Sequence, residues 1–193
     1  MPASDIMTIA QTGETILTRQ TQAVVTFDQA LVQLANSMIA TMNAAHGVGI
    51  AAPQVFSNLA IFIMHSKPNS RYPGAPLTQA TVVVNPQIIA VSDEMETENE
   101  GCLSIAGQRL EVTRHKSITV RYQSLQGDSI EQQLDGFIAR IFQHEFDHLQ
   151  GITLLERVKM PELQYVNQAD FPIPNQSYNN LHSPSLDGQG VSQ

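Results

Sequence analysis

The spacing of apolar residues predicts a helix over residues 27–42. Its apolar members recur at intervals of three and four: Phe27, Leu31, Leu34, Met38 and Met42. Asp28 lies in the first turn of this segment, where a negative charge suits the helix dipole. The stripe predicts that the helix packs one face against a hydrophobic core.

A second helix is predicted from about Gly136 to Leu149. Four of its residues, Phe137, Ile141, His144 and His148, form one stripe with spacings of four, three and four. Gly136 is a suitable start for this helix and Gly151 a suitable stop.

Short runs of β-branched, aliphatic and aromatic residues predict strands elsewhere in the chain. They are an edge strand at 23–25, strands at 59–64, 81–84 and 88–91, two strands through Val112 and 118–122, one at 130–134, and one at 152–155 that closes the sheet. Asn85-Pro86 is expected to end the strand before it, and the acidic run 92–100 is expected to be a solvated turn.

The character of the chain changes at Pro161. The residues that follow are rich in Pro, Asn, Gln and Ser, which predicts an irregular tail, partly docked through Tyr165, Phe171 and Ile173. The pattern therefore predicts one domain, residues 1–160, and a tail, residues 161–193.

The composition describes an ordinary globular protein. Of its 193 residues 42% are hydrophobic, and Cys102, the only cysteine, cannot form an internal disulfide. The N-terminus lacks a signal-peptide pattern and the run Leu59–Met64 is too short to span a membrane, so a cytoplasmic setting is expected. The net charge of −8 argues against nonspecific binding to nucleic acid or anionic membranes.

The second predicted helix contains the motif His-Glu-x-x-His at residues 144–148. Because residues four apart share a helix face, His144 and His148 can bind one metal ion, and Glu145 is then placed as a general base. The alternative is a chance match on an ordinary amphipathic helix.

Two histidines leave a tetrahedral metal ion short of protein ligands. The downstream candidates for a third are Glu156, Glu162 and His182, and the upstream candidate is Cys102. A lone cysteine is also commonly a small buried hydrophobe, and this choice stays open on residue types alone.

The segment His46–Gln54, which breaks the first helix, is rich in small residues and ends at Gln54. This segment is either a plain turn into a strand or a loop that faces substrate. In the second case the Gln54 amide can donate a hydrogen bond to an oxyanion.

Three motifs in order, GVGIAAPQ at 47–54, EGCLS at 100–104 and QHEFDHLQG at 143–151, strongly resemble those of peptide deformylase. The similarity covers about residues 25–158. It implies a hydrolase that removes the formyl group from the N-terminal formyl-methionine of new polypeptides. It also implies an α+β fold, with antiparallel β-sheets packed around a central helix carrying HExxH, plus an N-terminal helix.

The resemblance also assigns roles to individual residues. The metal ligands would be Cys102, His144 and His148, and the acid/base would be Glu145. The oxyanion donors would be Gln54 and the backbone N–H of Leu103, and Gly49 and Glu100 would lie in the substrate cleft. Arg109 and Arg114 stand where the family carries arginines, and Arg109 is expected to bind substrate. One divalent metal ion per chain is implied, Fe(II) in the cell, with Zn, Ni or Co able to substitute.

The helix stripe and the loop together suggest a binding slot for the methionine side chain. Phe137 and Ile141 precede His144 on its face, and Val48 and Ile50 come from the Gly-rich loop. The alternative is that these residues are only core.

The match to the family has departures. Ala106 stands where proline is usual and Phe56 where glycine is common, but neither position carries a catalytic group. The chain has no Lys or Arg after Lys159, so docking on the ribosome through a basic tail is expected to be weak or absent, and no direct nucleic-acid or membrane partner is expected. An organelle remains an alternative to the bacterial cytoplasm.

Two other functions compete with this assignment. One is a zincin-type metallopeptidase that takes its third ligand downstream. The other is a non-catalytic metal site, or an inactive relative that keeps the ligands; the presence of Glu145 and Gln54, which the metal does not need structurally, argues against it.

Overall fold

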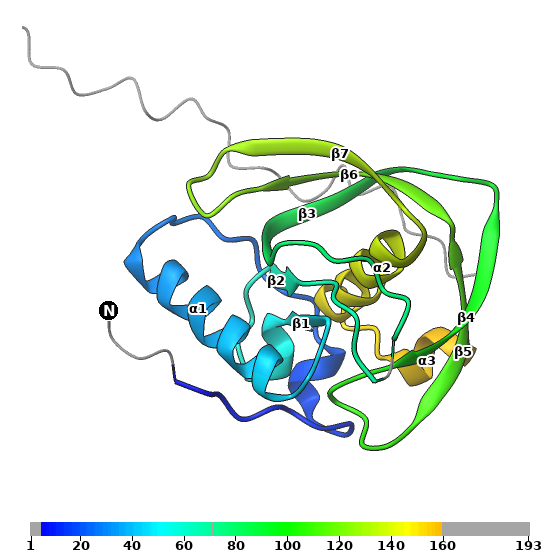
Figure 1. Ribbon diagram of the computed structural model, residues 1–193. Coiled ribbons are helices and arrows are strands. Elements are labelled where there is room, and N and C mark those ends of the chain that lie inside the picture. The colour runs from blue at the N-terminus through cyan, green and yellow to red at the C-terminus, as the bar shows by residue number, and fades with distance from the viewer. Residues whose placement is uncertain (1–4, 71, 160–193) are drawn as a thin grey trace, which may run out of the picture.

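The computed structural model describes residues 5–70 and 72–159, which form a mixed α+β fold with antiparallel sheets (Figure 1). The predicted fold class is confirmed at this level. The helices are α1 (Gln29–Ala44), α2 (Gly136–Leu149) and α3 (Leu154–Lys159), with 3-10 turns η1 (Thr15–Thr18) and η2 (Ala52–Val55). The strands are β1 (Gly49–Ala51), β2 (Ile61–Met64), β3 (Thr81–Val91), β4 (Met95–Gly101), β5 (Arg109–His115), β6 (Ser117–Gln123) and β7 (Ser129–Asp135).

The strands form two sheets. Five of them make one antiparallel sheet in the order β1-β2-β3-β6-β7, and β4 and β5 form a separate antiparallel hairpin. Within the described ranges, no helix is long and apolar enough to cross a membrane. The predicted tail at 161–193 lies outside the described residues.

The larger sheet is covered by a helix on each face, as Figure 1 shows for α1 and α2. Alternate residues of a strand point to opposite faces, so Phe62 of β2 packs with Phe142 and Phe146 of α2, while Ile61 and Ile63 pack on the other side in the cluster that contains α1. The strand β2 is therefore buried on both faces.

The helix α1 runs two residues later than predicted at each end. Asp28 is not in its first turn but is the N-cap, and its side chain accepts a hydrogen bond of 3.0 Å from the Leu31 backbone N–H. This bond satisfies one of the amide groups that a helix start leaves unpaired.

The helix α2 has the predicted bounds. Gly136, at φ +53°, turns the chain out of β7. Gly151 follows the helix at φ +74°, and a Cβ there would lie 2.8 Å from the backbone carbonyl of Thr18. Glycine is therefore required at the stop, both by the left-handed backbone and by the close approach of η1.

The predicted break at Asn85-Pro86 is wrong, because β3 runs on from Thr81 to Val91. The register against β6 shifts between Val84 and Gln87, and Asn85 takes a φ of +50°. Proline has no backbone N–H to donate to the neighbouring strand, and the shift in register accommodates it within β3. The Asn85 side chain instead bonds both backbone groups of Val24 at 2.8 Å.

The prediction of a solvated turn over 92–100 is also wrong from Met95 onward. Residues Met95–Gly101 form β4, which pairs along its whole length with β5. Four of the five acidic side chains, Asp93, Glu94, Glu96 and Glu98, are exposed as expected, whereas Glu100 is buried. Exposure of the others does not exclude a strand. Thr97 and Thr113, which face each other in the register, join their hydroxyls at 2.7 Å.

The predicted strand at 152–155 is wrong, since Leu154 begins the helix α3. Thr153 and Glu156 form a reciprocal cap: the Thr153 N–H donates to Glu156 Oε2 at 2.8 Å, and the Glu156 N–H donates to Thr153 Oγ1 at 3.4 Å. The Thr-x-x-Glu spacing was a helix signal that the apolar run obscured.

Two further differences concern short strands. The segment 23–25 is not a strand, and this region adds only an isolated parallel bridge between Gln22 and Leu59. The strand β1 (Gly49–Ala51) was not predicted, because three residues carry too little periodicity. The predicted strands at 59–64, through Val112, at 118–122 and at 130–134 are present as β2, β5, β6 and β7.

Candidate active site

Three donor side chains from distant parts of the chain meet at one point: Cys102, just after β4, and His144 and His148 on α2. Their donor atoms all lie within 4.8 Å of one another. Cys102 Sγ is 3.3 Å from His148 Nε2, and the centroids of the two imidazoles are 5.2 Å apart. This group could hold a metal ion with three protein ligands, which leaves a position for water or substrate.

The chemistry of the donors fits a divalent metal ion. Burial alone raises the pKa of the Cys102 thiol, but His148 and His144 outweigh it and hold that pKa well below its ordinary value. The thiolate is the form that binds metal. His144 Nδ1 bonds Glu100 Oε2 at 2.9 Å, which directs its Nε2 to the side of Cys102.

Glu145 lies beside this group and is 4% exposed. Burial raises the pKa of its carboxyl to about 7, against the opposing effect of His144 and His148. Its Oε2 is buried and has no hydrogen-bond partner within the described residues. A carboxylate with one unused oxygen and a pKa near neutral is suited to accept and return a proton.

Gln54 is held so that its amide nitrogen faces the cysteine. Its Oε1 accepts a 2.8 Å bond from the Ala51 backbone N–H, which turns Nε2 toward Cys102 Sγ, at 3.5 Å, and Ser104 Oγ, at 3.1 Å. The loop therefore faces the site and is not a plain turn. Ser104, which helps to orient the amide, is not singled out by the sequence.

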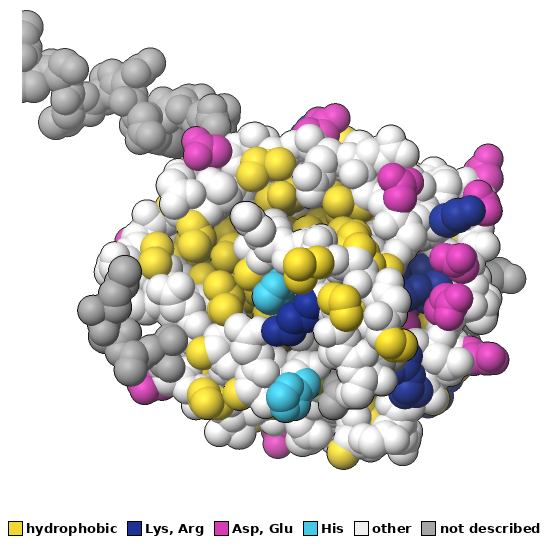
Figure 2. Space-filling model, viewed as in Figure 1, with side chains coloured by type: hydrophobic (Ala, Val, Ile, Leu, Met, Phe, Trp, Pro, Cys, Tyr) yellow, Lys and Arg dark blue, Asp and Glu magenta, His cyan; other side chains and the backbone are white. Residues whose placement is uncertain are grey.

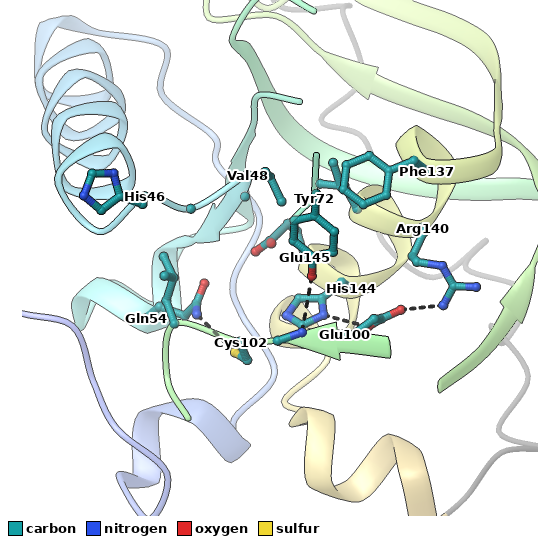
Figure 3. A pocket seen from close by; sticks show the side chains of 15 residues that line it. His46, Val48, Gln54, Tyr72, Glu100, Cys102, Phe137, Arg140, His144 and Glu145 are labelled. Atoms are coloured by element: carbon teal, nitrogen blue, oxygen red, sulfur yellow. Dashed lines mark hydrogen bonds and ion pairs between the residues drawn. The ribbon is translucent and has the colours of Figure 1, made fainter. Parts of the chain in front are cut away.

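A cavity opens beside these groups (Figure 3). Of the residues expected to contact substrate, the following line it: Val48, Gly49, Glu100, Phe137 and Ile141. On the surface, apolar side chains gather around a hollow with a histidine and a basic side chain at its centre (Figure 2). The cavity thus has an apolar wall next to a polar, catalytic one.

Tyr72 also lines the cavity, although nothing in its Pro- and Gly-rich segment indicated this. Its hydroxyl accepts a 3.3 Å bond from the Gly101 backbone N–H, and its ring lies 4.9 Å from that of Phe137. The tyrosine therefore ties the 66–78 segment to the end of β4.

The remaining predicted site residues differ in whether they line the cavity. Leu103 lines the cavity beside Cys102. Ile50 does not line it: the side chain is fully buried in the α1 cluster, because neighbouring strand residues point to opposite faces. Arg109 borders the adjacent groove, where its guanidinium lies 4.6 Å above the Tyr72 ring and donates to the Asn99 carbonyl at 2.6 Å.

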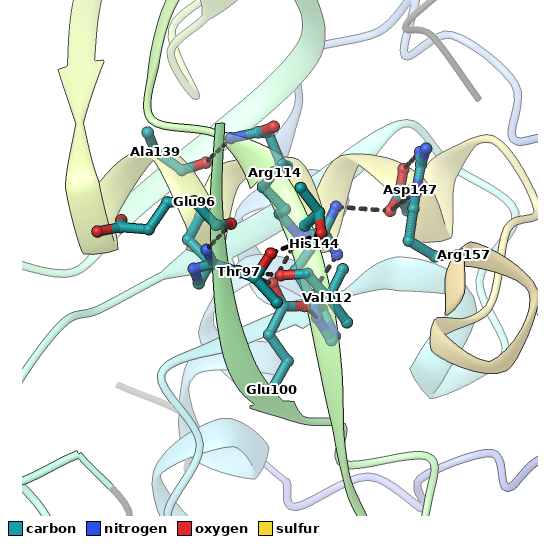
Figure 4. Close-up of polar contacts among 12 residues, drawn as sticks. Glu96, Thr97, Glu100, Val112, Arg114, Ala139, His144, Asp147 and Arg157 are labelled. Atoms are coloured by element: carbon teal, nitrogen blue, oxygen red, sulfur yellow. Dashed lines mark hydrogen bonds and ion pairs between the residues drawn. The ribbon is translucent and has the colours of Figure 1, made fainter. Parts of the chain in front are cut away.

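A buried network of charges supports the site from behind (Figure 4). Arg114 bonds both oxygens of Glu100, at 2.6 and 2.9 Å, and reaches Asp147 at 2.8 Å. Burial alone raises the pKa of Glu100, but Arg114 and His144 outweigh it and hold that pKa well below its ordinary value. Asp147 is further paired with Arg157 of α3.

The sequence left the role of Arg114 open and did not single out Arg140, Asp147 or Arg157. The sequence did contain a hint of these roles. Arg140 and Asp147 are charged residues within the predicted helix that carries the apolar stripe, and a charge that is buried with such a helix must be paired.

The downstream candidates for a third metal ligand receive no support. Glu156 accepts bonds from Thr153 at the start of α3 and is not part of the donor group. Glu162 and His182 lie outside the described residues.

Comparisons with known proteins show the family to which the chain belongs. Residues 6–164 match the family model described as polypeptide deformylase. The chain is 58% identical, over 164 residues, to peptide deformylase 2 of Shewanella oneidensis, covering 85% of this chain and 91% of that protein.

Solved structures show the same likeness. A Met-Ala-Ser-bound class I type b peptide deformylase from Acinetobacter baumannii is 45% identical with a TM-score of 0.79, covering 80% of this chain and 99% of that one. The peptide deformylase of Thermotoga maritima is 36% identical with a TM-score of 0.72, covering 79% and 97%. The chain therefore belongs to the polypeptide deformylase family, metal-dependent hydrolases that remove the formyl group from the N-terminal methionine of new polypeptides.

Proposed function

We propose that this chain carries out the family's reaction with one divalent metal ion held by Cys102, His144 and His148. The observation that carries the proposal is the convergence of these three donor atoms within 4.8 Å, beside the buried carboxylate of Glu145. The ion, when bound, polarises the formyl group and makes water acidic enough to attack near neutral pH. Two imidazoles and a thiolate suit Fe(II), the metal proposed for the cell, and equally accept Zn, Ni or Co.

Glu145 acts as the general base and then as the general acid. Its Oε2 takes a proton from the attacking water as that water's oxygen bonds to the formyl carbon. The same oxygen returns the proton to the amine nitrogen as the C–N bond breaks. Formate and a free amino terminus result.

Two donors stabilise the negative charge that develops on the formyl oxygen. One is Gln54 Nε2, which the Ala51 bond to Oε1 already aims toward Cys102. The other is the backbone N–H of Leu103, next to Cys102 in the chain. Because the Gln54 amide is oriented before substrate arrives, it needs no reorganisation during the reaction.

The methionine side chain occupies the apolar part of the cavity, against Val48, Phe137 and Ile141. Gly49 and Glu100 border the backbone of the first residue. Ile50 is buried in the α1 cluster and does not touch substrate, and Arg109 meets the peptide beyond the methionine. Tyr72 closes the slot from the 66–78 segment.

The remaining features of the proposal concern the whole chain. We take α2 as the central helix and α1 as the N-terminal helix of a catalytic unit that spans residues 1–160. Formylated chains arise where proteins are made, so the enzyme works in the cytoplasm, and transient contact with the ribosome does not use a basic tail.

The test is formate release from formyl-Met-Ala-Ser, by protein prepared without oxygen in the presence of Fe(II). Wild type is expected to release formate, and Glu145→Ala is expected to lose the activity while keeping one metal ion per chain. Metal-loaded wild type that releases no formate would overturn the proposal, and cleavage of an unformylated peptide would favour the metallopeptidase.

A further inference from the structure

Arg140 is almost entirely buried in α2, one turn before His144. Its Nη1 donates to Glu100 Oε1 and to the Val112 carbonyl, both at 2.9 Å, and its Nη2 donates to the Glu96 carbonyl at 2.7 Å. Glu96 and Glu100 belong to β4 and Val112 to β5. One guanidinium thus joins α2 to both strands of the hairpin.

The Glu100 carboxylate bridges two residues that are four apart on α2. Oε1 accepts from Arg140, and Oε2 bonds His144 Nδ1 at 2.9 Å. Arg114 also grips this carboxylate, but it does so from β5, within the same hairpin. Arg140 is therefore the cation that bonds this carboxylate from the helix that carries the histidines, whereas Arg114 reaches that helix through Asp147.

Further contacts tie the hairpin to α2 on both sides of His144. Arg140 lies before His144 and the Arg114–Asp147 pair, at 2.8 Å, lies after it. Next to His144, Gln143 bonds both backbone groups of His115, at 3.1 and 2.8 Å. Cys102 follows Gly101, the last residue of β4, so the position of the hairpin sets the position of the thiolate. A shift between hairpin and helix would change the separation of Cys102 from His144 and His148.

We propose that Arg140 is a positioning residue, which sets the spacing and orientation of the Cys102, His144 and His148 donors through Glu100 and the β4–β5 hairpin. Arg140 also lines the cavity, but the hydrogen bonds of its guanidinium are directed into the hairpin, so it acts through the ligands and not on the formyl group. This inference rests on the proposed function, because it concerns the same metal-binding group.

Three variants test it: Arg140→Met, which keeps an unbranched stem, Arg140→Lys, which keeps the charge, and Arg121→Met as the matched control. Arg121 is a partly exposed arginine paired with Glu131 on the far strands β6 and β7. Each protein is loaded with Co(II). The measurements are the absorption spectrum, the rate of chelator-driven cobalt release, kcat and KM for formyl-Met-Ala-Ser, and the Tm of the metal-free protein.

Arg140→Met is expected to release cobalt about 10-fold faster than wild type, the lower end of the range for losing a direct partner of a metal ligand, because Arg140 acts on His144 through Glu100. Its spectrum should change, and kcat should fall while KM stays within about two-fold, because the arginine positions ligands and not substrate. Arg140→Lys should be intermediate, since an ammonium cannot span the carboxylate and both carbonyls. The Arg121→Met control should match wild type.

The inference is overturned if the release rate and the spectrum match wild type while only the metal-free Tm falls, because Arg140 would then be merely structural. If Arg140→Met does not fold, the release rate of Arg140→Lys decides by the same criterion. A wild type that fails to retain cobalt would instead overturn the proposed function. Metal retention by wild type thus separates the two failures.

Discussion

Adding a single methyl group at Gly49 should disable Glu145 without touching any ligand. A Cβ on Gly49 would lie 2.7 Å from Glu145 Cδ and 2.9 Å from its Cγ, both well inside contact distance. Gly49 belongs to β1, at the edge of the five-stranded sheet, and is itself buried. Gly49→Ala therefore forces the carboxylate side chain away from its position beside the donor group.

The size of the effect follows from what Glu145 does. A positioned general base contributes about 10²–10⁴-fold to rate. Displacement leaves some proton transfer through water, so kcat/KM is expected to fall about 100-fold, or about 2.7 kcal/mol of transition-state stabilisation. Overpacking of a buried site typically costs about 1–3 kcal/mol of stability, so the protein should still fold.

The assay compares formate release by wild type, Gly49→Ala and a matched control, Gly74→Ala, each with metal content measured. A Cβ at Gly74 meets nothing within 4 Å, so this variant should stay within about two-fold of wild type. Gly49→Ala is also made in the Glu145→Ala background, where its effect should vanish because the displaced group is already absent.

Two results would refute this reasoning. One is a Gly49→Ala enzyme with wild-type kcat/KM. The other is an equal loss in the wild-type and Glu145→Ala backgrounds, which would show that Gly49 acts on substrate and not through Glu145.

Four other predictions follow from the site and the core. Gln54→Ala should lower kcat by about 10²–10³-fold, the usual loss of one oxyanion donor, with metal content unchanged; a loss under ten-fold in steady-state kinetics would remove Gln54 from that role. Cys102→Ser should lose metal during dialysis, as measured by elemental analysis, because a hydroxyl is a much poorer ligand than a thiolate; full retention would point to a different third ligand. In metal-free protein, folding raises the pKa of Glu145 from 4.5 to about 7. Its contribution to the free energy of unfolding is therefore fully present below about pH 4.5 and is lost as pH rises through 7. Between pH 4.5 and 7 the free energy of unfolding of wild type should therefore fall by up to about 3 kcal/mol relative to that of Glu145→Gln. Urea unfolding of both proteins across this pH range measures the difference, and a difference that does not change with pH would contradict the raised pKa. Phe142→Ala should cost about 3–5 kcal/mol in urea unfolding, because this ring is 0% exposed and packs edge-on to Phe62; a cost below 1 kcal/mol would mean that the core closes over the cavity.

The sequence alone determined the parts of this protein that depend on local spacing. The bounds of α2 followed from an apolar stripe between two glycines, and α1 was placed within two residues at each end. A helix turn sets the relation between His144 and His148, so their shared face needed no tertiary information. The order of three short motifs then indicated the family and, with it, the candidate ligands.

Predictions from the sequence were wrong where pairing between distant segments decides the structure. Asn85-Pro86 was predicted to end a strand, yet β3 continues across these two residues. The Asn85 side chain bonds the backbone of Val24, which is 61 residues away in the chain. The acidic run before Cys102 read as a turn, yet Met95–Gly101 is a strand, because β5 offers it a full ladder. Neither partner is visible in a local window.

The site itself shows the same division. Spacing suggested that Ile50 lines the slot, but pairing of β1 with β2 turns it into the core. The partners of Glu100 and His144, above all Arg140, came together only when α2 met the β4–β5 hairpin. Local periodicity fixes which residues share a face of one element, whereas the contacts between faces depend on how distant elements pack, and that is decided by the tertiary structure.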